Sequence, residues 1–183
     1  MTPGRGNIMQ QTLMGLYIKS NDLFLKNQIS LPPGPLVVGV EIENELNMGA
    51  IIRLACNFGC PAVRFVYQQI PGIKIARVNR TAHSSSHSVD WKLVNYSFLI
   101  ELQHKMSLIA IETTKNAVNI ADTVFPETCA LLVGSEIHGI PEEILAMCSH
   151  SVYIPMSGSN KSLNVSHALG IGLYEWLRQR LSG

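Results

Sequence analysis

Short apolar runs of strand length alternate with helix-like segments along most of this chain, and this alternation limits its fold more than any other feature. Strands are predicted at residues 36–42, 62–67, 108–111, 129–133 and 152–154. Helices are predicted between and after them, at residues 49–58, 96–105, 141–147 and 162–181. Strands that are apolar throughout are typical of a parallel sheet covered on both sides. We therefore predict an α/β fold with a mostly parallel sheet and helices on both faces.

Two stretches fall outside this alternation. The run Leu31-Pro32-Pro33-Gly34-Pro35 cannot continue a helix or a strand, because proline lacks the backbone donor. We therefore predict that residues 1–35 are an N-terminal helical extension, with one or two short helices within 7–30, followed by this Pro-rich linker. Residues 36–183 are predicted to form the main domain. Within it, residues 68–88 are polar and basic, and we predict an irregular loop there.

The charge balance excludes a protein held to nucleic acid by bulk charge alone. Lys and Arg number 14 against 13 Asp and Glu, for a formal net charge of +1, which predicts weak non-specific binding to nucleic acid. The longest apolar runs are of strand length, so no membrane-spanning helix is predicted. The 4 cysteines include no C-x-x-C pair, so no metal site is predicted. Because no apolar signal core follows Met1, we expect a cytoplasmic protein with reduced thiols.

Three polar segments follow predicted strands, at the sheet edge where parallel α/β folds bind ligands. The first runs from Asn47 to Arg53. Asn47 is a candidate helix cap, and Gly49 permits a close approach of backbone. Arg53 lies in an apolar helix, where a guanidinium needs an anion or other acceptors. A buried structural salt bridge is the alternative interpretation of Arg53.

The second and third segments lie in the last third of the chain. In residues 131–141 a strand runs into Gly134 and Glu136, and an ordinary turn with a solvated glutamate is the alternative interpretation. In residues 154–166 a polar loop opens a helix with Ser162 and Asn164. Helix N-termini suit carboxylates and phosphates, although capping by Ser162 alone would also explain this pattern.

Taken together, the three segments resemble the motifs of the SpoU–TrmH family of RNA ribose 2′-O-methyltransferases, in the SPOUT superfamily. The family patterns N-x-G-x-x-x-R, V-G-x-E-x-x-G-[IL]-P and I-P-M-x-G-x-x-x-S-L-N-V-S occur here in order, within a resemblance that covers residues 36–181. The resemblance implies a parallel α/β domain whose C-terminal segment forms a deep trefoil knot. It also implies a homodimer with the active site near the subunit interface, to which the last helix would contribute Tyr174, Trp176 and Leu177.

The cofactor implied by the resemblance is S-adenosylmethionine. By position in the family, its adenine and ribose meet the backbone around Ile111, Glu112, Thr113, Gly134, Ile154, Met156 and Leu163. An apolar slot with a few polar groups suits an adenine. The Rossmann fingerprint G-x-G-x-x-G is absent, so a nicotinamide site has no support.

The family's active-site positions match Asn47, Arg53, Glu136, Ser162 and Asn164. The implied reaction moves a methyl group from a sulfonium to a ribose hydroxyl, which loses its proton. A free guanidinium has a pKa above about 12, so we prefer Arg53 as the group that clamps the RNA phosphate and orients the 2′-hydroxyl, rather than as a base. Ser162 and Asn164 would position Arg53 or the ribose. Asn47 and Glu136 would shape the site and the subunit contact.

The substrate partner implied is RNA, with Lys74, Arg77 and Arg80 as candidate phosphate contacts in the segment where the family places a substrate-facing loop. His83 and His87 are interpreted as exposed loop residues. A structured tRNA fits a compact chain with few extensions, so tRNA is favoured over rRNA. The alternative function is a catalytically silent module of the same fold that binds RNA or S-adenosylmethionine. The five intact active-site positions argue against that alternative.

Overall fold

The computed structural model describes residues 20, 22–23 and 32–181. Residues 33–183 form one compact unit. The helices predicted within 7–30 lie outside the described residues, except that Ser20, Asp22 and Leu23 are helical. The architecture below therefore concerns the unit that begins at Pro33.

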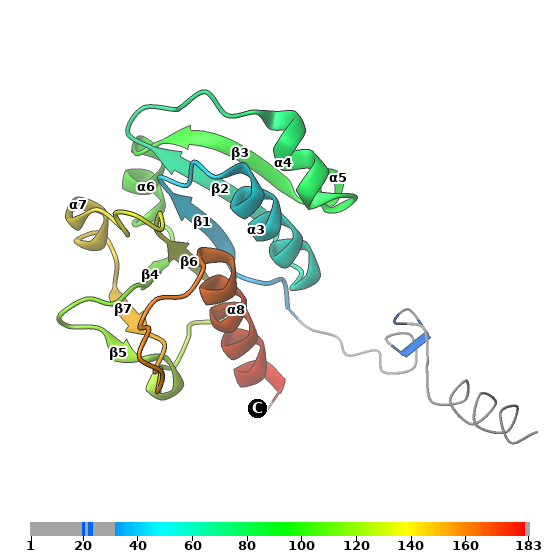
Figure 1. The fold of residues 1–183 in the computed structure, drawn as a ribbon. Coiled ribbons are helices and arrows are strands. Elements are labelled where there is room, and N and C mark those ends of the chain that lie inside the picture. The colour runs from blue at the N-terminus through cyan, green and yellow to red at the C-terminus, as the bar shows by residue number, and fades with distance from the viewer. Residues whose placement is uncertain (1–19, 21, 24–31, 182–183) are drawn as a thin grey trace, which may run out of the picture. The chain divides into compact units, whose positions relative to one another are not determined.

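This unit is built on a 7-stranded sheet whose strands run parallel throughout, in the order β3-β2-β1-β6-β4-β7-β5 (Figure 1). The strands are β1 (Leu36–Val40), β2 (Ala62–Tyr67), β3 (Asp90–Asn95), β4 (Ser107–Ile111), β5 (Val118–Asn119), β6 (Cys129–Val133) and β7 (His150–Tyr153). Every residue of β6, at the centre, is buried. A strand with both faces covered must be apolar at each position, so the prediction of a mostly parallel sheet is confirmed.

Helices cover both faces of the sheet, which is also as predicted. They are α3 (Glu45–Asn57), α4 (Ile75–Ala82), α5 (Ser85–Ser88), α6 (Ser97–Leu102), α7 (Glu142–Leu145) and α8 (Val165–Leu181), with a 3-10 turn η1 (Ile120–Asp122). One hydrophobic core joins α3, α4 and α8 to the sheet. A second core joins α6 and α7 to the opposite face. None of the helices in the described ranges is long and apolar enough to cross a bilayer.

Helix α3 begins four residues before its predicted start at Gly49. Its cap is Asn44, whose side-chain oxygen accepts from the backbone N–H groups of Leu46 and Asn47. The prediction that Asn47 caps this helix is therefore wrong, because Asn47 lies in the first turn. A Cβ atom on Gly49 would lie 2.4 Å from the Cβ atom of Thr81, so this glycine permits the close approach of α3 to α4.

The prediction of an irregular loop over residues 68–88 is confirmed for residues 68–74 and wrong for residues 75–88. The segment contains α4 and α5, and strand β3 follows it at one edge of the sheet. Helix α4 buries only Val78 and Ala82, one turn apart. Because the other residues of this helix are mostly polar, two buried positions do not produce a recognisable helical pattern in the sequence. Strand β3 pairs with β2 alone, so it keeps polar side chains.

The strands predicted at residues 62–67 and 129–133 have the predicted bounds, and the other predicted elements exist with shifted bounds. Helix α8 begins at Val165 rather than Ser162, and Asn164 caps it by accepting from the backbone N–H of Ser166 at 2.9 Å. Trp176 is 1% exposed and donates its indole N–H to the Pro126 carbonyl. The prediction that Trp176 contributes to a subunit interface is therefore wrong, because its ring belongs to the chain's own core. Tyr174 is 59% exposed on the same helix.

Candidate functional site

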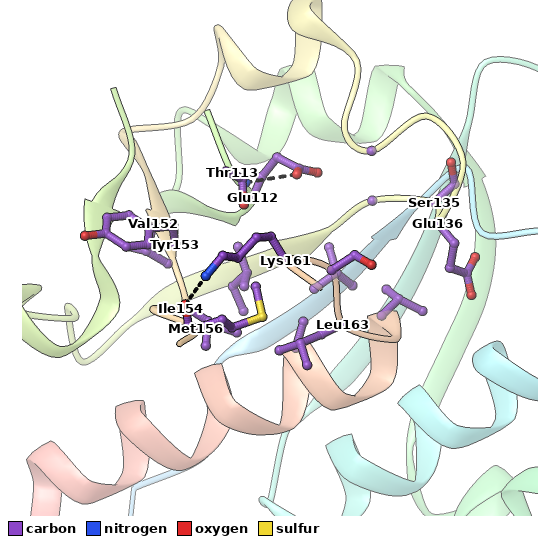
Figure 2. A pocket seen from close by; sticks show the side chains of 17 residues that line it. Glu112, Thr113, Ser135, Glu136, Val152, Tyr153, Ile154, Met156, Lys161 and Leu163 are labelled. Atoms are coloured by element: carbon purple, nitrogen blue, oxygen red, sulfur yellow. Dashed lines mark hydrogen bonds between the residues drawn. The ribbon is translucent and has the colours of Figure 1, made fainter. Parts of the chain in front are cut away.

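A pocket of about 290 Å³ lies where β4, β6 and β7 end, closed on one side by the segment that leads into α8. This is the carboxyl edge of the parallel sheet, the usual ligand site of such folds. All seven residues that the family resemblance assigned to the cofactor line this pocket: Ile111, Glu112, Thr113, Gly134, Ile154, Met156 and Leu163. Figure 2 shows their arrangement, with Tyr153 at one end of the pocket and Glu136 at the other.

The lining combines apolar walls with polar side chains from several segments. The walls come from Val133, Val152 and Val165 as well as from the predicted aliphatic residues. Sequence reasoning missed Ser135, Gly139, Tyr153 and Lys161, which also line the pocket. Apolar walls with hydrogen-bonding groups beside them are the environment in which an adenine binds. The chemistry of the lining therefore fits an adenosine-containing cofactor.

The loop after β6 folds back on itself at Gly134 and Gly139. The Gly139 N–H donates to the Ser135 carbonyl at 2.9 Å. A Cβ atom on Gly134 would lie 2.2 Å from the Gly139 carbonyl carbon, and Gly139 itself has a φ of 64°. Gly134 is therefore required by the close approach of two parts of one loop, and this contact lies within the protein rather than with a ligand.

Glu112 fixes this loop to the end of β4. One carboxylate oxygen accepts from the Thr113 N–H at 3.0 Å, and the other accepts from the Ile140 N–H at 3.1 Å. Both bonds are charge-assisted. The side chain of Glu112 therefore has a structural role at the pocket, beyond the backbone contact expected from the family.

Glu136 and Ser162, two of the predicted catalytic residues, also line the pocket. Both are exposed. The Ser162 hydroxyl and backbone N–H each donate to the Asn160 side-chain oxygen at 3.0 Å. These bonds hold the loop before α8 in a turn.

Asn47 and Asn164, two further predicted catalytic residues, are in direct contact. The Asn164 amide nitrogen donates to the Asn47 side-chain oxygen at 3.1 Å. This bond joins the first turn of α3 to the start of α8.

Arg53 is exposed and lines a separate groove between α3 and α8, together with His167 and Tyr174. The predicted cost of burying its guanidinium in an apolar helix is therefore not incurred. The groove has a volume of about 660 Å³ and walls that include Ala50 and Ile171. Within one chain, Arg53 and the pocket at the strand ends thus belong to two cavities.

The three predicted RNA contacts belong to α4. Lys74 precedes the helix as its cap residue, and Arg77 and Arg80 follow at intervals of three, all of them exposed. Arg77 lies 3.6 Å from a carboxylate oxygen of Glu45. The three cations thus share one side of a short helix. His83 and His87 are exposed, as predicted, although His87 lies in α5.

An additional polar cluster ties together the ends of β1 and β2. Glu41 has a φ of 53°, a left-handed conformation that is costly for a residue other than glycine. Its carboxylate accepts from the Gln68 N–H at 2.8 Å and from the Tyr96 hydroxyl at 2.7 Å. Burial and this carboxylate raise the pKa of Tyr96 above its ordinary value. No residue pattern in the sequence pointed to this cluster.

Among the residues that the structure describes, no group of three His, Cys, Asp or Glu side chains could hold a metal ion.

Comparison with known proteins relates this geometry to a family of enzymes. The model described as the SpoU rRNA Methylase family matches residues 34–174. A tRNA (guanosine(18)-2′-O)-methyltransferase of Aquifex aeolicus is 31% identical over 151 residues, which are 79% of this chain and 69% of that protein. A 23S rRNA (guanosine-2′-O-)-methyltransferase of Acinetobacter baylyi is 30% identical over 149 residues, which are 77% of this chain and 58% of that protein. The chain spans 69%, 43% and 61% of the first three curated relatives.

Solved structures give the same result. The Aquifex aeolicus TrmH/SpoU tRNA modifying enzyme has a TM-score of 0.72 and 28% identity, covering 82% of this chain and 77% of that one. The SpoU methyltransferase AviRb from Streptomyces viridochromogenes, in complex with the cofactor AdoMet, has a TM-score of 0.73 and 25% identity, covering 86% of this chain and 62% of that one. AdoMet is S-adenosylmethionine, the cofactor that the motifs imply and that the pocket lining fits. The chain belongs to the SpoU rRNA methylase family, a family of methyl-transferring enzymes.

Proposed function

We propose that this protein is an S-adenosylmethionine-dependent RNA ribose 2′-O-methyltransferase, with tRNA favoured over rRNA as its substrate. One observation carries the proposal: the second and third motifs form a single pocket that fits an adenosine, and the Asn47–Asn164 bond joins it to the helix that bears Arg53. Relatives that act on tRNA and on rRNA have similar identity to this chain. The preference for tRNA rests on the near-neutral charge and compact size of the main domain.

In this proposal the pocket holds the cofactor by its adenosine end. The backbone around Ile111, Gly134 and Leu163 contacts the adenine and ribose, and the side chain of Glu112 keeps the loop after β6 in position. The bound cofactor supplies an electrophilic methyl group. The protein's own residues bring the ribose hydroxyl to it and exclude water from the apolar slot.

Arg53 clamps the RNA phosphate and orients the 2′-hydroxyl, in the role that the sequence suggested. Its exposure on the α3 side of the groove leaves the guanidinium open to an anion from solution. Ser162 and Asn164 position the ribose or Arg53, and Glu136 and Asn47 shape the site. Lys74, Arg77 and Arg80 contact phosphates farther along the RNA.

A homodimer completes the proposal. The groove between α3 and α8 is largely apolar and includes Ile171 and Tyr174, which are 39% and 59% exposed. An isologous interface buries the same exposed apolar surface on both subunits, and this helical face offers such a surface. Because Arg53 lines this groove, a second copy seated there would lie beside the substrate clamp. Sedimentation equilibrium at micromolar concentration tests this part, and a monomer would contradict it.

We also infer the deep trefoil knot of the family. Its support is membership of the family. The C-terminal half of α8 is also bound by the segment between η1 and β6. Gln179 donates to the Thr123 carbonyl at 2.8 Å, and Arg180 donates to the Phe125 carbonyl at 2.7 Å. The proposed location is the cytoplasm, where RNA substrates occur and where the four free cysteines would stay reduced.

The decisive experiment is the methylation of total RNA with labelled S-adenosylmethionine, followed by mapping of the modified nucleotide. Transfer to a ribose 2′-oxygen is expected, with tRNA labelled more strongly than rRNA. Isothermal titration with S-adenosylmethionine separates the enzyme from the catalytically silent alternative. Cofactor binding without transfer to any RNA would favour that alternative.

A further inference from the structure

Lys161 contributes a positive charge to the lining of the pocket. Among the described residues that line it, Lys161 alone carries a cationic side chain, whereas Glu112 and Glu136 are acidic. Lys161 occupies a variable position of the third motif, between Asn160 and Ser162. The family pattern therefore does not account for its presence.

The ammonium group of Lys161 already lies over the pocket. Its Nζ atom donates to the Met156 carbonyl at 2.6 Å, and both residues line the cavity. Figure 2 shows the side chain extended toward the end of β7 and ending at this carbonyl. An ammonium has three donors and a neutral carbonyl takes one of them. An anionic acceptor would form the stronger, charge-assisted bond.

S-adenosylmethionine contains one anionic group, the carboxylate of its amino-acid end, beside two cationic groups, the sulfonium and the α-ammonium. Both oxygens of the Glu112 carboxylate already accept hydrogen bonds from backbone N–H groups. Glu112 is therefore engaged in fixing the loop after β6. We propose that Lys161 binds the cofactor carboxylate and so makes the site selective for cofactors with an intact amino-acid end. This inference rests on the proposed cofactor site and adds a specificity-determining residue to it.

A purely structural role for Lys161 would have a different signature. If the side chain only closes the loop through the Met156 carbonyl, its removal would weaken all adenosine ligands alike. If it binds the carboxylate, its removal would weaken only ligands that carry that group. Decarboxylated S-adenosylmethionine keeps the sulfonium and the amine but lacks the carboxylate, and it therefore separates the two roles.

The test is isothermal titration of the full chain with S-adenosylmethionine and with its decarboxylated form, for the wild type and for Lys161→Met. We expect the wild type to prefer the carboxylated form by about five- to tenfold, the range of an exposed ion pair improved by a charge-assisted bond. Lys161→Met should lose this preference and bind the decarboxylated form within about twofold of the wild type. Lys161→Arg should retain part of the preference.

Lys105→Met is the matched control, because Lys105 is exposed and does not line the pocket. It should bind both ligands as the wild type does. A preference that survives in Lys161→Met, or an equal loss for both ligands, would overturn the proposal. A wild-type protein that binds neither ligand would instead contradict the proposed cofactor site, and with it the proposed function.

Discussion

The side chains of Asn47 and Asn164, 117 positions apart in sequence, form a hydrogen bond of 3.1 Å between the starts of α3 and α8. Asn164 uses its other side-chain atom, the oxygen, to cap α8 through the Ser166 N–H. The side-chain amide of Asn164 thus joins the third motif to the first and also caps the last helix. The two residues that follow Asn164 line different cavities: Val165 lines the pocket, and Ser166 lines the Arg53 groove.

This contact predicts a measurable coupling between the two residues. Asn164→Ala should lower the free energy of unfolding by about 1.5–2 kcal/mol, because α8 loses its cap and the bond to Asn47 is also lost. Asn47→Ala should cost less, and the double variant should cost about 0.5–1 kcal/mol less than the sum of the two, because their shared bond is lost only once. Urea unfolding of the four proteins measures this. Costs that add fully would show that the bond contributes nothing to stability.

Arg53→Ala should reduce methyl transfer by about a hundredfold or more, the usual effect of losing a positioning group. Its affinity for S-adenosylmethionine should stay within about twofold of the wild type, because Arg53 lines the α3–α8 groove and not the pocket. Single-turnover kinetics and titration, performed on the same preparation, measure the two quantities. Undiminished methyl transfer would show that Arg53 is not needed for the reaction. An equal loss of cofactor affinity would show that Arg53 acts in cofactor binding instead.

The sequence predicted the pocket more accurately than it predicted the elements around it. The seven residues assigned to the cofactor by position in the family all line one pocket, because most of them lie at or just after the ends of β4, β6 and β7. The fully apolar run of β6 also matches a buried strand of the observed sheet. Helix α4 and strand β3 were missed because they lie toward one end of the sheet. There a segment needs to bury only a residue or two, such as Val78. So few buried positions do not produce the apolar spacing by which a helix or strand is recognised in a sequence.

Other features depended on contacts that the sequence does not reveal. Asn44 and Asn47 are equally good cap residues by type, and only the packing of the α3 turn selects Asn44. Trp176 was predicted at a subunit contact, but its side chain is buried within the chain and donates a hydrogen bond to the Pro126 carbonyl. The left-handed Glu41 follows from the hydrogen bonds to Gln68 and Tyr96, which come from distant parts of the chain.

Gly134→Ala should weaken cofactor binding and destabilise the fold by about 1–3 kcal/mol. The added methyl group would lie 2.2 Å from the Gly139 carbonyl carbon, so the loop after β6 must open. Gly72→Ala is the control, since nothing lies within 4 Å of its Cβ position. Thermal unfolding and cofactor titration of both variants test this. Equal behaviour of the two variants would mean that the loop yields at little cost.

Arg80→Ala should reduce the salt dependence of RNA binding. Each phosphate contact contributes a slope of about one in the logarithm of affinity against the logarithm of salt concentration. Filter binding of tRNA between low and moderate salt measures the slope, with Lys105→Ala as a control on the α6 side of the sheet. A slope unchanged by Arg80→Ala would place the RNA elsewhere on the surface.

Stability should fall at alkaline pH, in part through Cys129. This thiol is 2% exposed, and burial raises its pKa to about 11, against an opposing effect of Arg180. Because the folded-state pKa lies above the unfolded value of about 9, the stabilisation is complete below that pH and is lost as the pH rises through 11. Two pKa units correspond to about 2–3 kcal/mol at full ionisation.

Cys129→Ala separates this contribution from those of the other titrating groups. The variant should start less stable at pH 8, because a small cavity replaces the sulfur, but its free energy of unfolding should fall less steeply between pH 8 and pH 10.5. Urea unfolding at several pH values gives both curves. The gap between wild type and variant should narrow steadily with pH, since only the wild type contains the Cys129 thiol, which ionises more readily in the unfolded chain, whereas Cys60 and Cys148 are present in both proteins. Two parallel curves would show that the Cys129 thiol titrates alike in the folded and unfolded chain.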